Sequence, residues 1–230
     1  MVPQLSPVDT PVAEHKQGCL GQLELFPHLT NAEFDEACST LLRRFEMHGR
    51  RQVEWNAVES LSSSETTYLR ITKPLALQLD LPGTGDDNEE AELREDDDEV
   101  AETPASSRAV SHYDVVLSPA YRVPVLYFSI SDTLHRYPPT MEMLYSALVP
   151  PAFKAQAEHV GVIGGITITD HPVTNKPVFF IHPCRTAEVM EASVGGRNIT
   201  AYDYLLLWIG AFGKCVGLNV PLTLVDRKND

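Results

Sequence analysis

Cysteine is scarce in this sequence, which has only Cys19, Cys38, Cys184 and Cys215 in 230 residues. Their wide, uneven spacing matches no zinc or CxxC pattern, and four cysteines are too few for a disulfide scaffold in a chain of this length. We therefore expect reduced thiols in a cytoplasmic protein, with no metal and no other cofactor. Each cysteine is then either buried or chemically useful.

Long apolar runs and basic residues are also lacking. The longest apolar run, Leu205–Phe212, is far shorter than the ~20 residues that span a bilayer. The first segment, Met1–Gln17, lacks the apolar core of a signal peptide. Lys and Arg number 18 against 32 Asp and Glu, which gives a net charge of −14. This deficit argues against a nucleic-acid partner and against a stable membrane anchor, since both depend on basic residues.

The acidic residues are concentrated in one segment. Residues 86–102 hold eleven acidic residues and one arginine, and the rest of the chain holds 21 acidic and 17 basic residues, so its charge is only −4. Like-charge repulsion and few apolar residues predict a disordered acidic insertion at about 82–108. Residues 1–28, rich in proline, predict a flexible N-terminal arm. We expect one domain at 29–230, interrupted by the insertion, and a monomer.

The patterned segments predict an α+β fold, with an antiparallel sheet of about four strands flanked by helices. A helix that Thr30 or Asn31 can cap carries an apolar stripe and should end near Gly49. A helix at about 200–214 is apolar on nearly all sides, so it should be buried. Further helices are predicted at 141–148 and 186–193. Strand-like patterns occur at 53–57, in the first part of 68–81, and at 113–117, 123–130, 161–168 and 178–181.

Cys184 is the cysteine whose surroundings suit chemistry. It follows an apolar run and Pro183, and it precedes a segment that can begin a helix at Thr186. A thiol there would feel the positive end of the helix dipole and the charge of Arg185, and both favour the thiolate. The alternative is a small hydrophobic residue packed beside a strand. The local pattern leaves both interpretations open.

The residues around Cys184 resemble those of the E2-like conjugating enzymes of autophagy. Asp170-His171-Pro172 is followed by Phe179–Thr186, which contains the His-Pro-Cys signature. The autophagy-related protein 3 family typically continues this signature as HPC-x-H and the autophagy-related protein 10 family as HPC-x-T, and Thr186 matches the second family. Val216–Leu222 is similar to that family's VGLNLPL ending, and Tyr121–Phe128 resembles its Y-x-x-P-x-L strand.

This resemblance implies an E2-like fold and an E2-like transferase activity. The enzyme would accept autophagy-related protein 12, a ubiquitin-like protein, from the E1-like autophagy-related protein 7 as a thioester on Cys184. It would then transfer autophagy-related protein 12 to a lysine of autophagy-related protein 5. A cysteine suits both transfers, because a thiolate is a good nucleophile and a good leaving group.

Six further residues are candidates for supporting the active site: Tyr121, Asp170, His171, His182, Pro183 and Thr186. Asp170 and its neighbour His171 could orient or deprotonate the incoming lysine, or Asp170 could instead cap a turn. Tyr121 could support the transfer step or could simply pack. His182 could fix the loop through a hydrogen bond to the backbone, and Pro183 would shape the chain that enters the cysteine. Thr186 matches the family signature.

Other functions stay open at this point. The sister enzyme would conjugate a ubiquitin-like protein to phosphatidylethanolamine, but residues 1–29 show no amphipathic, membrane-seeking face. A non-catalytic E2-like module would only bind a ubiquitin-like protein, and a cysteine hydrolase would use a histidine base near the thiol. The hairpin at 114–130 could accept a strand from a partner at a sheet edge, and Pro124 within it would confine its strand to an edge or to an irregular position.

Overall fold

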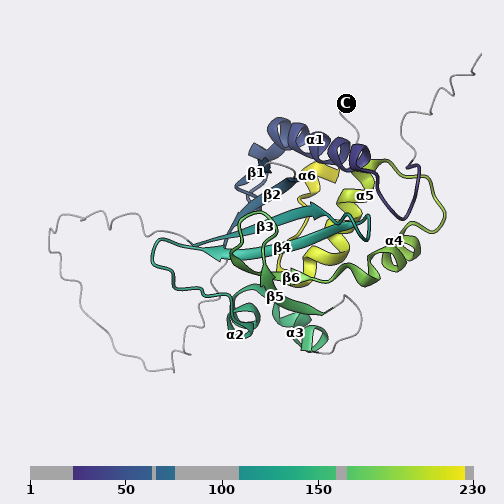
Figure 1. The fold of residues 1–230 in the computed structure, drawn as a ribbon. Coiled ribbons are helices and arrows are strands. Elements are labelled where there is room, and N and C mark those ends of the chain that lie inside the picture. Colours follow the sequence, from purple (N-terminus) through teal and green to yellow (C-terminus); the bar gives the residue numbers. More distant parts are fainter. Residues whose placement is uncertain (1–22, 64–65, 76–108, 159–164, 226–230) are drawn as a thin grey trace, which may run out of the picture.

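The computed structural model describes residues 23–63, 66–75, 109–158 and 165–225 (Figure 1). The predicted insertion at about 82–108 lies outside these residues, as do residues 1–22 of the predicted arm. Residues 23–28 of that arm correct our boundary, because they pack on the domain: Leu23 is buried, and Pro27 accepts a hydrogen bond of 2.8 Å from the Tyr204 hydroxyl. Within the described ranges, no helix has the length and apolar character needed to cross a membrane.

An antiparallel sheet of six strands, in the order β1-β2-β3-β4-β6-β5, forms the centre of the described part. This confirms the α+β class, with more strands than the four or so expected. The last two strands form a short hairpin that joins the sheet through only three residue pairs, between Leu126–Phe128 and Phe179–Ile181. So short a pairing has no clear signal in the sequence. The strands are β1 (Ala57–Ser63), β2 (Thr66–Pro74), β3 (Val110–Leu117), β4 (Pro124–Ser131), β5 (Ile166–Asp170) and β6 (Pro177–Ile181).

The first helix begins where its capping residue predicts. The Thr30 hydroxyl accepts a hydrogen bond from the Glu33 backbone N–H, and the Glu33 carboxylate accepts one from the Thr30 N–H. This reciprocal pair satisfies N–H groups that a helix start leaves unpaired. The described helices are α1 (Asn31–His48), α2 (Met141–Met143), α3 (Pro151–Glu158), α4 (Thr186–Val194), α5 (Ala201–Trp208) and α6 (Leu222–Val225). Wider π-helical turns extend α2 through Leu148 and α5 through Gly213.

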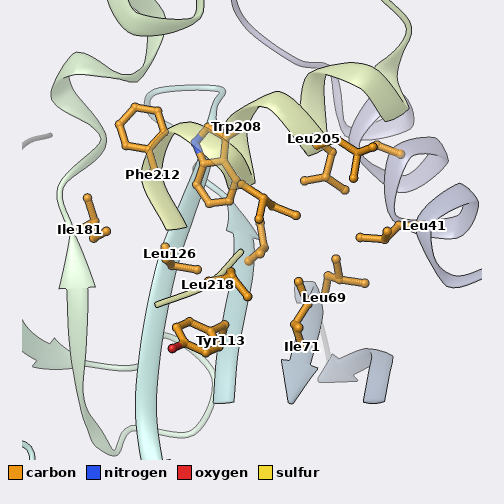
Figure 2. Close-up of a cluster of buried hydrophobic side chains, with 14 of the residues drawn as sticks. Leu41, Leu69, Ile71, Tyr113, Leu126, Ile181, Leu205, Trp208, Phe212 and Leu218 are labelled. Atoms are coloured by element: carbon orange, nitrogen blue, oxygen red, sulfur yellow. The ribbon is translucent and has the colours of Figure 1, made fainter. Parts of the chain in front are cut away.

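The core lies between one face of the sheet and the helices α1 and α5. Figure 2 shows Leu205, Trp208 and Phe212, from α5 and its extension, in one cluster with Leu41 of α1 and Leu126 of β4. All of these side chains are buried. Each contributes about 1.5–3 kcal/mol by leaving water. The prediction that the helix at about 200–214 is buried is therefore confirmed.

Two predictions about strands were wrong. Residues 53–56 form a bend rather than a strand, and β1 begins only at Ala57. The Gln52 side chain bonds both the N–H and the carbonyl of Trp55 and leaves Val53 exposed. The β3–β4 hairpin occupies the interior of the sheet, where β2 and β6 already pair with it. It therefore has no edge for a partner strand, and Pro124 is tolerated as the first residue of β4.

Candidate active site

Cys184 lies at the junction between β6 and α4, in a single 3₁₀ turn formed by Pro183–Arg185. Its thiol is free and exposed. The backbone N–H of Cys184 donates a hydrogen bond of 3.2 Å to Nδ1 of His182. Because Nδ1 is the acceptor, the neutral His182 ring carries its proton on Nε2. His182 thus caps the turn that presents the thiol, as expected for a loop-fixing residue.

The His182 ring is held between two other rings. Tyr121, from the β3–β4 turn, meets it edge to face with centroids 5.6 Å apart, and Phe180 of β6 does the same at 5.9 Å. The Tyr121 hydroxyl makes no hydrogen bond within the described part of the chain. Its side chain is 44% exposed. The structure therefore brings Tyr121 and His182 together beside the Cys184 turn and leaves a phenol group available there.

Arg185 and Thr186 take other roles beside the cysteine. The Arg185 guanidinium bonds both carboxylate oxygens of Glu188 at 2.9–3.2 Å, and this interaction lowers the pKa of Glu188. Arg185 therefore shares its charge between Glu188, its hydrogen-bonded partner, and Cys184, with which it also interacts electrostatically. Thr186 is the buried first residue of α4 and packs at the base of the turn.

Asp170 and Cys184 lie at opposite ends of the β5–β6 hairpin. Asp170 pairs with Pro177 at the first residue of β6, whereas His182, which leads into the cysteine, bonds the Gly165 carbonyl beyond the other end. The four residue steps from Pro177 to Ile181 span about 13 Å at about 3.3 Å each. Asp170 is exposed at its end of the hairpin. The structure therefore does not bring Asp170 to the thiol.

His171 is a buried structural residue. Its side chain is 1% exposed, and its Nε2 lies 3.2 Å from a carboxylate oxygen of Asp114 on β3. Its Nδ1 accepts hydrogen bonds from the N–H groups of Val173 and Thr174, within the turn that joins β5 to β6. Nδ1 is thus hydrogen-bonded, whereas Nε2 lies within ion-pair distance of Asp114 without the geometry of a hydrogen bond. His171 anchors this turn on the outer face of the sheet, opposite the core.

Asp114 completes this buried cluster. Its two carboxylate oxygens accept hydrogen bonds of 2.7 Å from Arg70 on β2. Burial alone would raise the pKa of Asp114, but the interactions with Arg70 and His171 outweigh burial and lower it. The rings of Tyr68 and Tyr127 flank His171, each with its centroid 5.3 Å away. These contacts account for His171 without a catalytic role.

A cavity of about 520 Å³ opens beside the Cys184 turn. His182 and Pro183 form one wall, Tyr121 and its turn a second, and the start of α1 a third, with Phe34 and Asp35. The sequence contains no local signal for the contribution of α1, because α1 and the cysteine are far apart in the chain. Among the described residues, no cluster of three His, Cys, Asp or Glu side chains is arranged to hold a metal.

Comparison with known proteins places this site in a family. The model of "Autophagocytosis associated protein, active-site domain" matches residues 33–223. The Ubiquitin-like-conjugating enzyme ATG10 of Gibberella zeae is 33% identical over 86% of this chain and 97% of that protein. The human ATG10 is 37% identical over 57% of this chain and 60% of its own length, and that of Arabidopsis thaliana is 25% identical over 86% and 95%. The chain belongs to the ATG10 family of autophagy E2-like conjugating enzymes, which are transferases.

Proposed function

We propose that Cys184 accepts the ubiquitin-like autophagy-related protein 12 from the E1-like autophagy-related protein 7 and transfers it to a lysine of autophagy-related protein 5. The observation that carries the proposal is the exposed, unpaired Cys184 thiol in a turn that His182 fixes. The other two described thiols, Cys38 and Cys215, are buried. An incoming thioester can therefore reach Cys184 and not these two.

The reaction consists of two acyl transfers. The Cys184 thiolate attacks the thioester carbonyl on the E1, a new C–S bond forms, and the E1 thiolate leaves. The deprotonated lysine then attacks the new thioester, so that a C–N bond forms and the C–S bond to Cys184 breaks. The negative charge that develops on the carbonyl oxygen needs a donor. The Tyr121 hydroxyl, which makes no hydrogen bond in the described chain, is the donor that we propose.

The test of the first transfer is a non-reducing gel. The full chain is incubated with autophagy-related proteins 7 and 12 and ATP, and we expect a band that dithiothreitol removes. Cys184→Ser should give a band that resists dithiothreitol but is cleaved by hydroxide, because an oxyester replaces the thioester. Cys184→Ala should give none, while the matched control Cys38→Ala should behave like the wild type. A dithiothreitol-sensitive band with Cys184→Ala would reject Cys184 as the carrier.

The acceptor is tested by adding a second protein to the loaded enzyme. With autophagy-related protein 5 present, the thioester band should decay as a conjugate that resists dithiothreitol accumulates. If vesicles containing phosphatidylethanolamine discharge the thioester into lipid instead, the chain has the activity of the sister enzyme. If the wild type never forms a thioester, the chain is a binding module.

A further inference from the structure

The cavity beside Cys184 has one ionisable carboxyl group. Asp35 is the single acidic residue in its lining, and no lysine or arginine side chain contributes to the lining. Asp35 lies on the second turn of α1 and is exposed. It forms no ion pair or hydrogen bond through its side chain within the described part of the chain. An acidic group at a cavity wall without a basic partner is suited to a positively charged ligand.

The other walls of the cavity suit an aliphatic chain. Aromatic rings line it from the β3–β4 turn, with Tyr121, and from the sheet, where Tyr127 on β4 and Phe180 on β6 are neighbours. Pro183 adds an apolar surface directly before the reactive cysteine. Methylene groups pack favourably on such walls, and aromatic faces attract an ammonium group. A lysine side chain has this combination of an apolar stem and a cationic end.

We propose that this cavity receives the acceptor lysine and that Asp35 binds its ammonium group. The inference rests on the proposed function, since it requires a thioester on Cys184. A lysine side chain that enters between Tyr121 and Pro183 passes the cysteine turn with its stem against the rings. The negative charge of Asp35 attracts the cationic lysine to the cavity and favours an amine acceptor over uncharged acceptor groups such as hydroxyls.

The proton balance of the transfer gives Asp35 a second effect. The lysine must change from ammonium to amine before it attacks, and the carboxylate of Asp35 can take the proton and pass it to water. The amine nitrogen then forms the C–N bond, and the electron pair of the broken C–S bond leaves on the Cys184 sulfur. The nitrogen loses its remaining extra proton to water.

The experiment separates loading from discharge. Wild-type and variant enzymes are first loaded with autophagy-related protein 12, the E1 is then stopped by removing ATP, and the rate of thioester loss is measured with autophagy-related protein 5 or with free lysine. We expect Asp35→Asn to load normally but to discharge about tenfold more slowly to both acceptors, the size of effect that one hydrogen bond to a charged group gives. Asp35→Glu should restore most of the rate.

The matched control is Glu36→Gln, which removes the same charge one residue later on an exposed face outside the cavity lining. It should discharge like the wild type. Equal rates for Asp35→Asn and the wild type would overturn the proposal. A defect with the protein acceptor but not with free lysine would also overturn it, since Asp35 would then contact a neighbouring residue of the acceptor. A defect in loading would assign the cavity to the donor protein.

These outcomes are distinct from failure of the proposed function itself, in which the wild type forms no thioester. A structural effect of the substitution is recognised by comparing the KM for free lysine with the loading rate. Loss of an ammonium-binding carboxylate should raise the KM for free lysine and leave the loading rate unchanged. A partly unfolded variant would lower loading and discharge together, so the urea unfolding midpoint of each variant is measured alongside.

Discussion

At the scale of single residues, the Cys184 N–H donates a hydrogen bond to Nδ1 of His182 within the turn that carries the thiol. It ties the backbone of the cysteine to a ring that Tyr121 and Phe180 hold in place. The orientation of the thiol is thus set by packing around a neighbouring side chain, and the proline between them limits the backbone further.

We predict that His182→Ala slows thioester formation about fivefold. Removal of a typical hydrogen bond costs about 1 kcal/mol, which corresponds to that factor, because the turn around Cys184 then samples other orientations. His182→Asn should recover most of the rate, since the amide oxygen can accept the same hydrogen bond. The measurement is the initial rate of thioester formation on a non-reducing gel. An alanine variant that loads at the wild-type rate would show that the turn holds its shape without the ring.

The signature around Cys184 allowed this residue, His182 and Pro183 to be predicted together from the sequence. The same reasoning could not separate Asp170 and His171 from the site. Residues a short distance apart in sequence can lie at opposite ends of a hairpin, and only strand pairing reveals this. Asp35 was not predicted as a neighbour of Cys184, because residues far apart in the sequence can line the same cavity. Asp35 lies on a helix that is distant from the cysteine in the chain and supplies one wall of that cavity.

At the scale of elements, the Arg70–Asp114–His171 cluster fastens the turn of the β5–β6 hairpin to β2 and β3. The hairpin is otherwise bound to the sheet through three residue pairs of β4 and β6. The same hairpin carries Cys184 at its other end. Loss of the cluster should therefore loosen the hairpin that leads into the candidate active site.

Asp114→Asn is predicted to destabilise the protein by about 3 kcal/mol at pH 7, the lower end of the range for breaking a buried ion pair. The pKa of Asp114 is lowered in the folded state, so its contribution is complete above the ordinary aspartate value near 4. It is lost as the pH falls through the lowered folded-state value. Urea unfolding from pH 7 down to pH 3 should show the wild type and the variant converging in acid. A constant difference at all pH values would contradict this assignment.

Element prediction from sequence succeeded where the pattern was long or capped. The helix α1 and the pairing of β3 with β4 followed from the apolar stripe and from alternation on either side of a turn. The error at Val53 arose because Trp55 is buried through the Gln52 turn and through its indole N–H, which bonds the Asn219 carbonyl at 2.8 Å. Alternation of apolar and polar side chains indicates a strand only when the backbone is extended.

At the scale of the whole molecule, the points where the acidic segment leaves and rejoins the domain are adjacent. The Leu75 N–H donates a hydrogen bond of 3.0 Å to the Ala109 carbonyl. Both residues lie at the end of β2 and β3 opposite the turn that carries Tyr121. Because the Cys184 turn lies beside Tyr121, Cys184 is at the opposite end of the sheet from Leu75 and Ala109.

We predict that replacing residues 82–108 with a two-residue Gly-Ser linker leaves thioester formation nearly unchanged and stabilises the fold by about 1 kcal/mol, because a loop about fourfold shorter costs less entropy to close. Thermal unfolding and the thioester gel test the two parts of this prediction. As a control, a neutral Gly-Ser segment of the original length should match the wild type in both. Loss of loading in both variants would show that the acidic residues recruit a basic partner surface.

The burial of the other thiols bears on the fidelity of the enzyme as a carrier. Burial is the main cause that raises the pKa of Cys38 to about 12 and that of Cys215 to about 11. Both thiols therefore stay protonated at neutral pH. Under the proposed mechanism, neither buried thiol should compete with Cys184 for the acyl group or remove it from Cys184 by exchange within the chain. Among the described residues, burial in the hydrophobic core thus leaves Cys184 as the one exposed thiol, which the proposed acyl transfer requires.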